Sequence, residues 1–257
     1  MAEELILQHV NMQFKGVKAV DDFNAHFEKG KIYGLIGTNG AGKSTVINMI
    51  SGSYKPTSGE IRFGEYEINK LPSYKIAEIG IARTFQNLRL FKNMTVIENV
   101  IVAEQLRNKY NFFQMLVGTG KYRKTEKQMR ESAYEALEIM GIEKFANMKS
   151  GNLAYGYQRR LEIARCLATD PKFLLLDEPA AGMNPNESLQ LVDEIRKIHT
   201  ERDITILLIE HDMKVIMSLC EYIYAMASGK TIAEGTPKEI QNNQDVIKAY
   251  LGGVDNA

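Results

Sequence analysis

The sequence has few cysteines, no net charge and no long apolar run, and each of these features argues against one class of protein. Cys166 and Cys220 have no CxxC or Cys/His spacing around them, so we expect two reduced thiols rather than a disulfide or zinc framework. Lysine plus arginine and aspartate plus glutamate both total 32, so the net charge points to no nucleic-acid partner. These features are typical of an ordinary cytosolic protein.

The longest apolar run, residues 204–209, has the length of a buried strand and falls far short of the roughly 18 residues that suggest a membrane span. Glu3 and Glu4 stand where a secretory signal would carry bases, and no apolar segment follows them. We therefore expect a chain that reaches a membrane only through a partner. Its 257 residues, 44% of them hydrophobic, suffice for one large α/β domain.

The first third of the chain reads as short strands around one strand–loop–helix unit. Apolar runs alternate with turns over residues 5–33, and residues 56–69 read as a further turn and strand. The run at 32–36 passes directly into a glycine-rich loop and then a predicted helix at 44–50. We expect strands of mixed type to flank this unit.

The middle of the chain has a helical pattern. Apolar residues recur at helical spacing over 95–147, the charged run at 121–130 is typical of a solvated helix face, and 118–120 is a predicted loop tip. Strands and helices alternate again from residue 158, which predicts a parallel sheet covered by helices. The predicted elements there are helices at 159–167 and 188–199 and strands at 173–176 and 204–209.

The strongest motif is a phosphate-binding loop, which fits G-x-x-x-x-G-K-[ST] between the predicted strand and helix. Glycines let the backbone curl so that successive N–H groups point at phosphate oxygens, and the helix adds its positive end. Lys43 would place a cation on the β- and γ-phosphates, and the Ser44 hydroxyl would complete a Mg²⁺ shell. The motif predicts binding of ATP or GTP by Gly37, Thr38, Asn39, Gly40, Ala41, Gly42, Lys43, Ser44 and Thr45.

A second motif is the apolar strand at 173–176, which ends in two acids, Asp177 and Glu178. A buried parallel strand delivers such residues to the crevice where α/β sheets bind ligands. Asp177 could then hold Mg²⁺, and Glu178 could orient or deprotonate an attacking water. An Asp-Glu pair after a strand is commonly a solvated turn, but the phosphate loop upstream favours the catalytic interpretation.

Together these motifs resemble the ATP-binding subunit of an ABC transporter over essentially the whole chain. The family's signature, usually Leu-Ser-Gly-Gly-Gln, corresponds here to a helix-opening segment that, by resemblance, caps the ATP held by a second subunit. Ala154 replaces the serine, Tyr155 the first glycine and Tyr157 the glutamine. We therefore expect the phosphate contact to rest mainly on the Gly156 N–H.

The resemblance implies roles for four further residues. Gln86 matches the glutamine that senses Mg²⁺ and the γ-phosphate beside the membrane-subunit contact, and His211 matches the switch histidine that contacts the γ-phosphate. Phe14 matches the aromatic residue that stacks on adenine, with a core phenylalanine as the alternative. Asn184 stands where the family more often has aspartate in the segment that crosses the dimer interface, which would weaken coupling between the sites. The implied catalytic residues are Glu178, His211 and Lys43, and the implied Mg²⁺ ligands are Ser44, Gln86 and Asp177.

The implied fold is an α/β P-loop NTPase core with a mixed or parallel sheet, an antiparallel β subdomain and a helical subdomain that carries the signature. We expect one ATP-binding domain over the whole chain. Its core would span about 1–90 and 158–240, its helical subdomain about 91–157 and its tail about 241–257.

The Ala154-Tyr155-Gly156 form of the signature, residues 178–185 and the tail at 245–252 resemble the branched-chain amino-acid importers. This implies an ATPase at the cytoplasmic face of the inner membrane, paired head to tail with a paralogue or an identical chain. Its other partners would be two integral membrane permease subunits and, indirectly, an extracytoplasmic solute-binding protein.

Two alternatives come from other classes. One is a soluble ABC-type ATPase for DNA repair, ribosome function or cofactor assembly. The stretch between Thr45 and Leu153 is too short for the coiled coils of repair members, and the chain has one phosphate loop where ribosomal members usually have two. The other is a non-catalytic nucleotide sensor, which would lack Glu178 or His211, and both are present.

Overall fold

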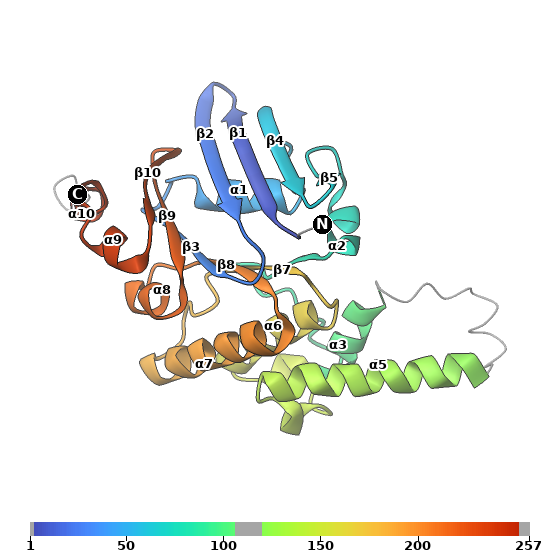
Figure 1. Cartoon of the computed structure of the whole chain (residues 1–257). Coiled ribbons are helices and arrows are strands. Elements are labelled where there is room, and N and C mark those ends of the chain that lie inside the picture. The colour runs from blue at the N-terminus through green and yellow to red at the C-terminus, as the bar shows by residue number, and fades with distance from the viewer. Residues whose placement is uncertain (1–2, 106–119, 252–257) are drawn as a thin grey trace.

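The computed structural model describes residues 3–105 and 120–251, and its N-terminal part forms an antiparallel sheet (Figure 1). Its strand order is β2-β1-β4-β5. The strands are β1 (Leu5–Phe14), β2 (Val17–Phe27), β4 (Ser58–Phe63) and β5 (Tyr66–Glu67). The β1–β2 hairpin turns at Lys15 and Gly16, whose φ angles of 43° and 94° are the positive values that a tight hairpin turn requires.

The second sheet has six strands in the order β10-β9-β3-β8-β7-β6, parallel except for β10. They are β3 (Ile32–Gly37), β6 (Ile81–Arg83), β7 (Phe173–Asp177), β8 (Thr205–Ile209), β9 (Tyr222–Ala227) and β10 (Lys230–Gly235). Every residue of β3, β7 and β8 is buried, as expected for strands covered on both faces. Because these three are parallel neighbours, their carboxyl ends and the loops that follow meet at one edge of the sheet.

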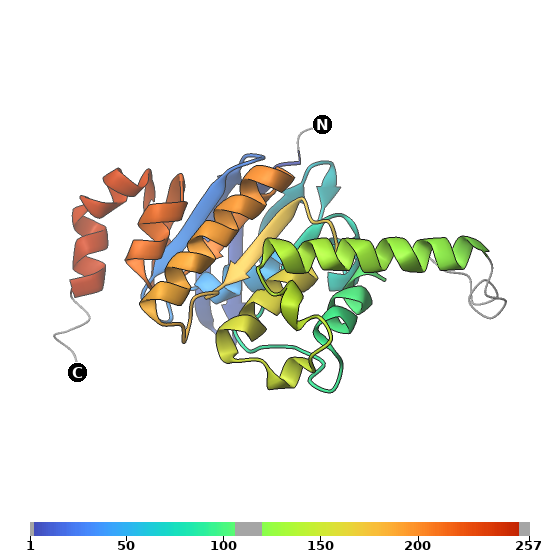
Figure 2. The same ribbon diagram turned by 90° about the horizontal axis from the view of Figure 1, so that it is seen from below.

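Helices cover the sheet and form a separate layer around α5 (Figures 1 and 2). They are α1 (Lys43–Ile50), α2 (Ser73–Glu78), α3 (Val96–Glu104), α5 (Gly120–Ile139), α6 (Tyr155–Leu167), α7 (Pro185–Arg202), α8 (Met213–Leu219), α9 (Pro237–Gln241) and α10 (Gln244–Leu251). α3, α5 and α6 pack on one another, and α6 also contacts β6. None of the helices in the described ranges is both long and apolar enough to cross a membrane.

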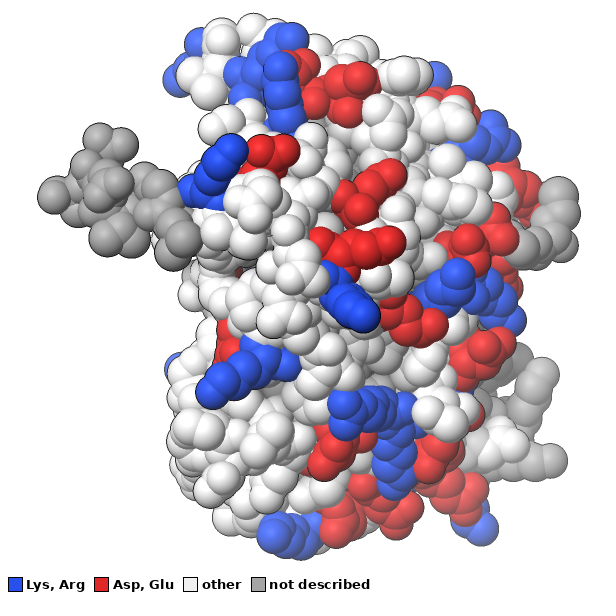
Figure 3. All heavy atoms as spheres, turned by 60° about the vertical axis from the view of Figure 1, so that its left-hand side comes forward, with Lys and Arg blue, Asp and Glu red and all other residues white. Residues whose placement is uncertain are grey.

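Successive residues of one strand face two different cores. Leu174 and Leu176 of β7 belong to the core shared with the helices, whereas Leu175 belongs to the core shared with the antiparallel sheet and α1. This alternation explains why β7 reads as a continuous apolar run. On the face shown in Figure 3, acidic and basic side chains are interspersed, in keeping with their equal totals.

The expected fold class is confirmed, including the antiparallel sheet. The predicted loop tip at 118–120 is wrong at Gly120, which begins α5, and its other two residues lie outside the described residues. The short strand β6 was not predicted from the sequence. Helix α6 runs across the expected boundary at residues 157 and 158, and the division into subdomains stays a prediction.

The two cysteines are both free and buried. Burial raises the pKa of each thiol to about 12, so Cys166 and Cys220 are unreactive as nucleophiles.

Candidate nucleotide-hydrolysis site

The loop at residues 37–45 connects β3 to α1, as the motif predicts, and its glycines are required by geometry. Gly37, Gly40 and Gly42 have φ angles of 151°, 78° and 106°. A β-carbon at Gly37 would lie 2.2 Å from the carbonyl oxygen of Met226. A β-carbon at Gly40 would meet nothing within 4 Å, so this part of the loop borders open space. The curled backbone and the first turn of α1 offer N–H groups to an anion.

The Lys43 side chain is buried inside this curl. Its Nζ donates to the carbonyl oxygens of Gly37 at 2.6 Å and Thr38 at 3.0 Å. Burial lowers the pKa of Lys43, while the nearby carboxylates of Glu178 and Asp177 oppose that shift. The phosphate loop and the acidic strand end therefore share one electrostatic environment.

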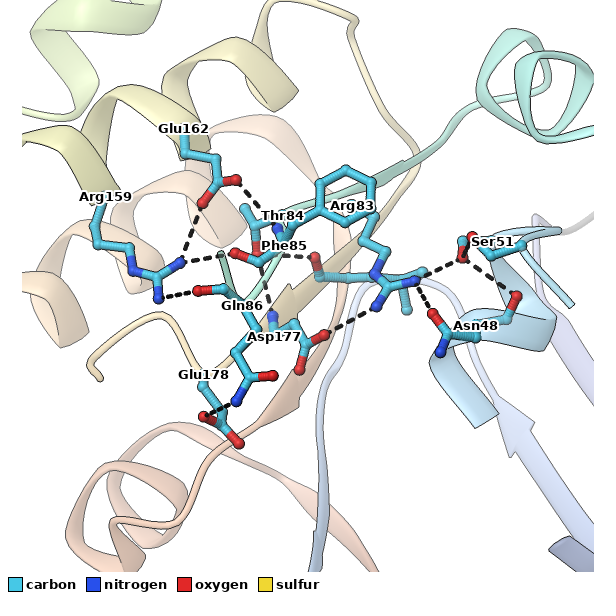
Figure 4. A network of polar contacts seen from close by, with 12 residues as sticks. Asn48, Ser51, Arg83, Thr84, Phe85, Gln86, Arg159, Glu162, Asp177 and Glu178 are labelled. Atoms are coloured by element: carbon cyan, nitrogen blue, oxygen red, sulfur yellow. Dashed lines mark hydrogen bonds and ion pairs between the residues drawn. The ribbon is translucent and has the colours of Figure 1, made fainter. Parts of the chain in front are cut away.

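Asp177 ends β7 and is 4% exposed. Its Oδ2 accepts a hydrogen bond from Arg83 Nη2 at 2.9 Å, and the same guanidinium donates to Asn48 and Ser51 at the end of α1 (Figure 4). The Thr84 hydroxyl donates to the carbonyl oxygen of Leu175 and accepts from the Asp177 N–H. Arg83 thus ties the acidic strand end to the helix that follows the phosphate loop, a role the sequence did not indicate.

Glu178 follows Asp177 in a left-handed conformation, with φ of 50°, which a non-glycine residue rarely adopts. Its N–H donates to the carbonyl oxygen of Ile209. Its carboxylate lies between Gln86 Nε2, at 3.1 Å, and His211 Nε2, at 2.7 Å. These contacts bring together three residues that were singled out from separate parts of the sequence.

Glu210 is a site residue that the sequence reasoning missed. It is 4% exposed, and its two carboxylate oxygens accept from the Ala180 N–H at 2.6 Å and the His211 N–H at 3.2 Å. Burial raises the pKa of Glu210, and these two N–H groups oppose the shift. Glu210 thereby joins the loops that follow β7 and β8. An acid placed directly after a largely apolar strand was the available signal.

The signature residues begin α6, with Ala154 as its N-cap and Tyr155 and Gly156 in its first turn. Their neighbours belong to the segment after Glu178. A β-carbon on Gly182 would lie 3.0 Å from the Tyr155 ring, and one on Gly156 would lie 3.4 Å from the Glu187 carboxylate. The first N–H groups of α6 have no partner within the helix and are available to an anion.

The remaining departures have local explanations. The Tyr157 ring packs against Phe145 at 4.8 Å, and Asn184 caps α7 by accepting from the N–H groups of Asn186 and Glu187.

Phe14 is 39% exposed at the β1–β2 turn, 5.3 Å from the Tyr54 ring. The alternative of a core phenylalanine is therefore wrong, because the hairpin turn carries Phe14 beyond either core.

Comparisons with known protein families and structures agree with the function that this site geometry indicates. The family model described as "ABC transporter" matches residues 20–181, and the model described as "Branched-chain amino acid ATP-binding cassette transporter" matches residues 230–256. The chain is 49% identical to the high-affinity branched-chain amino acid transport ATP-binding protein BraF of Pseudomonas aeruginosa, over 95% of each chain. It is 47% identical to LivG of Escherichia coli, over 94% of each chain.

A solved ATP-binding cassette of an ABC transporter in its ADP conformation superposes with a TM-score of 0.84 and 30% identity, over 98% of this chain and 99% of that one. A nucleotide-free cassette has a TM-score of 0.83, also at 30% identity, over 97% and 99% of the two chains. Sequence, fold and site geometry therefore agree, and the chain belongs to the ABC transporter family, within its ATP-binding cassettes.

Proposed function

We propose that this chain is the ATP-hydrolysing subunit of an importer for amino acids, branched-chain ones in particular. The observation that carries the proposal is the Glu178 carboxylate, held between Gln86 and His211 at the sheet edge that also bears the phosphate loop. The names of the relatives and the family model at residues 230–256 support the solute class.

ATP would bind with its phosphates against the N–H groups of residues 37–45 and against the Lys43 ammonium. Lys43 is already enclosed by the loop, so little side-chain freedom remains to be lost on binding. The exposed Phe14 ring offers a flat apolar surface to the adenine.

The residues present also fit Mg²⁺. Ser44, Gln86 and Asp177 line one cavity of about 880 Å³, and their hydroxyl, amide and carboxylate oxygens are the hard ligands that Mg²⁺ prefers. No group of three or more His, Cys, Asp or Glu side chains in the described ranges could hold a metal by itself, which suits an ion shared with phosphates. When bound, Mg²⁺ would neutralise charge on the phosphates.

Hydrolysis would use Glu178 as the base. Its carboxylate would take a proton from water while the water oxygen bonds the γ-phosphorus and the bond to the β–γ bridging oxygen breaks. Gln86 and His211 keep that carboxylate in one orientation, and the Lys43 cation stabilises the charge that develops on the phosphoryl group.

A second subunit would complete the site. The N–H groups at the start of α6, Gly156 foremost, would cap ATP held by the phosphate loop of a paralogue or an identical chain. Membrane permease subunits would dock at the cavity beside Gln86, whose wall includes Phe85, Arg89 and Phe91. The chain would then lie at the cytoplasmic face of the inner membrane, served indirectly by an extracytoplasmic solute-binding protein.

Replacing Glu178 by glutamine tests the proposal. The amide keeps the size of the side chain but cannot take a proton, so we expect the hydrolysis rate to fall by about 100-fold or more. ATP should then trap a stable dimer, which size-exclusion chromatography with and without ATP would detect. Glu201→Gln, on the exposed side of α7, is the control and should leave both properties unchanged. A Glu178→Gln variant that hydrolyses ATP at the original rate would remove Glu178 from the reaction.

A further inference from the structure

Helix α6 holds the backbone of Phe85 and Gln86 through two side chains one turn apart, Arg159 and Glu162 (Figure 4). Arg159 Nη1 donates to the Phe85 carbonyl oxygen at 2.8 Å, and Nη2 donates to that of Gln86 at 2.6 Å. Glu162 Oε1 accepts from the Phe85 N–H at 3.2 Å. Side chains of one helix therefore hydrogen-bond to the Phe85 N–H and to the carbonyl oxygens of both residues.

The same arginine reaches the first turn of α6. Its Nε donates to the Tyr155 hydroxyl at 3.1 Å, and the Tyr155 ring lies against Gly182. At the other end of the connection, the Gln86 side chain donates to Glu178. A continuous series of contacts thus runs from the signature segment through Arg159 to Gln86 and the carboxylate.

The two charged groups are deeply buried, with 3% of Arg159 and 4% of Glu162 exposed, and they pair at 3.3 Å. Burial raises the pKa of Glu162, opposed by the Phe85 N–H and Arg159. Removing two charges from water is costly, and an apolar pair of similar size is often as stable. Fold stability is therefore a poor explanation for this pair, whereas the fixed direction of its hydrogen bonds suits the placement of a backbone segment.

We propose that Arg159 and Glu162 are positioning residues that set the place of Gln86, and through it the Glu178 carboxylate, relative to the signature segment. The inference rests on the proposed role of Glu178 in hydrolysis. A shift of α6 would move the Phe85–Gln86 backbone with it, because Arg159 and Glu162 hydrogen-bond to three of its backbone groups, the Phe85 N–H and the two carbonyl oxygens. The signature segment that one subunit presents to its partner is thereby connected to that subunit's own hydrolytic carboxylate.

The test is the double variant Arg159→Met/Glu162→Met in the full chain, which replaces the buried ion pair by apolar side chains. We expect the thermal unfolding midpoint and the affinity for a fluorescent ATP analogue to stay near their original values. We expect kcat to fall by about 10-fold to 100-fold with little change in KM, because a displaced Gln86 leaves Glu178 misplaced. Amide hydrogen exchange in the peptide that contains Phe85 and Gln86 should become faster.

Helix α6 offers a matched control. Arg160 pairs with Glu194 of α7 at 3.1 Å and is also buried, but it faces away from the Phe85–Gln86 segment. Arg160→Met/Glu194→Met should leave kcat and the exchange of that segment unchanged. An equal loss of kcat in the control would show that Arg159 and Glu162 have only a structural role and would overturn the inference.

Single variants decide the matter if the double variant fails to fold. Glu162→Gln keeps an oxygen acceptor for the Phe85 N–H and should retain most of kcat, whereas Arg159→Lys keeps the charge but not the two-nitrogen contact with the Phe85 and Gln86 carbonyl oxygens and should not. An Arg159→Lys or double variant that folds and retains the original kcat overturns the inference. Failure of the proposed function would be distinguishable, because Glu178→Gln would then hydrolyse ATP normally whatever stands at positions 159 and 162.

Discussion

At the scale of single residues, the site depends on backbone conformations that few residue types tolerate. Gly37, Gly40 and Gly42 supply positive φ angles in the phosphate loop, and Glu178 adopts one despite its side chain. Such conformations cost of order 1 to 3 kcal/mol for a residue with a β-carbon and persist where the surroundings hold them. For Glu178 the surroundings are Gln86 and His211, which fix its carboxylate.

Two glycine variants separate a steric clash from backbone strain alone. Gly37→Ala would bring its β-carbon to 2.2 Å from the Met226 carbonyl oxygen, whereas Gly40→Ala would meet nothing within 4 Å. We expect the free energy of unfolding to fall by about 2 to 3 kcal/mol or more for Gly37→Ala. For Gly40→Ala we expect about 1 to 2 kcal/mol, from the left-handed conformation only. Urea denaturation without nucleotide measures both, and equal losses would contradict this explanation.

At the scale of elements, buried ion pairs connect α6 to its surroundings in two directions. Arg159 and Glu162 face the Phe85–Gln86 segment, while Arg160 faces Glu194 on α7. Burial is the main cause of the raised pKa of Glu194, about 7 instead of 4.5, and Arg160 opposes it. The contact between α6 and α7 therefore carries a group that titrates near neutral pH.

This shift predicts a pH dependence of stability. Between pH 4.5 and about 7 the folded state keeps the Glu194 proton that the unfolded chain has lost, so this group's contribution to stability declines as the pH rises through that window. Glu194→Gln should remove that decline. The measurement is the free energy of unfolding of both proteins at several pH values between 4 and 8. A difference between the two proteins that does not change with pH would show that Glu194 has an ordinary pKa.

At the scale of the whole molecule, the site collects residues from loops that follow β3, β6, β7 and β8, while the signature segment lies at the start of α6 (Figures 1 and 2). Gly156 lies beside Glu187 in the segment after Glu178. The first N–H groups of α6 have no partner within the helix, as the proposed role toward the nucleotide of a second subunit requires.

Variants at Gly156 test whether the signature segment acts on the nucleotide of the partner subunit. Alanine fits, because its β-carbon would lie 3.4 Å from the Glu187 carboxylate and Gly156 is helical, whereas aspartate would place a second negative charge there. We expect both variants to bind ATP normally as isolated subunits. Gly156→Asp should suppress hydrolysis strongly, since its charge would repel the partner's phosphates, and Gly156→Ala should do so weakly. Loss of ATP binding and hydrolysis together would contradict a role toward the partner's nucleotide.

The sequence by itself determined the parts of the site that lie in continuous stretches. The strand, glycine loop and helix around residues 37–45 form a local unit whose backbone geometry depends on its own glycines. The apolar strand that ends in Asp177 and Glu178 is equally local, and parallel neighbours explain why both stretches reach one edge. The roles expected of Gln86 and His211 came from family resemblance, because a glutamine after a phenylalanine or a histidine near a strand end does not by itself indicate a catalytic site.

Only the tertiary structure decided which distant side chains support these motifs. Arg83 meets Asp177 across 94 residues of sequence, Arg159 meets the Phe85 carbonyl across 74, and Glu210 meets Ala180 across 30. The first and third pairings depend on strand order and the second on how α6 packs beside β6, and neither is encoded in the local pattern of charge or hydrophobicity. A buried arginine or glutamate reads in sequence like any solvated one, since its partner becomes its neighbour only when the chain folds.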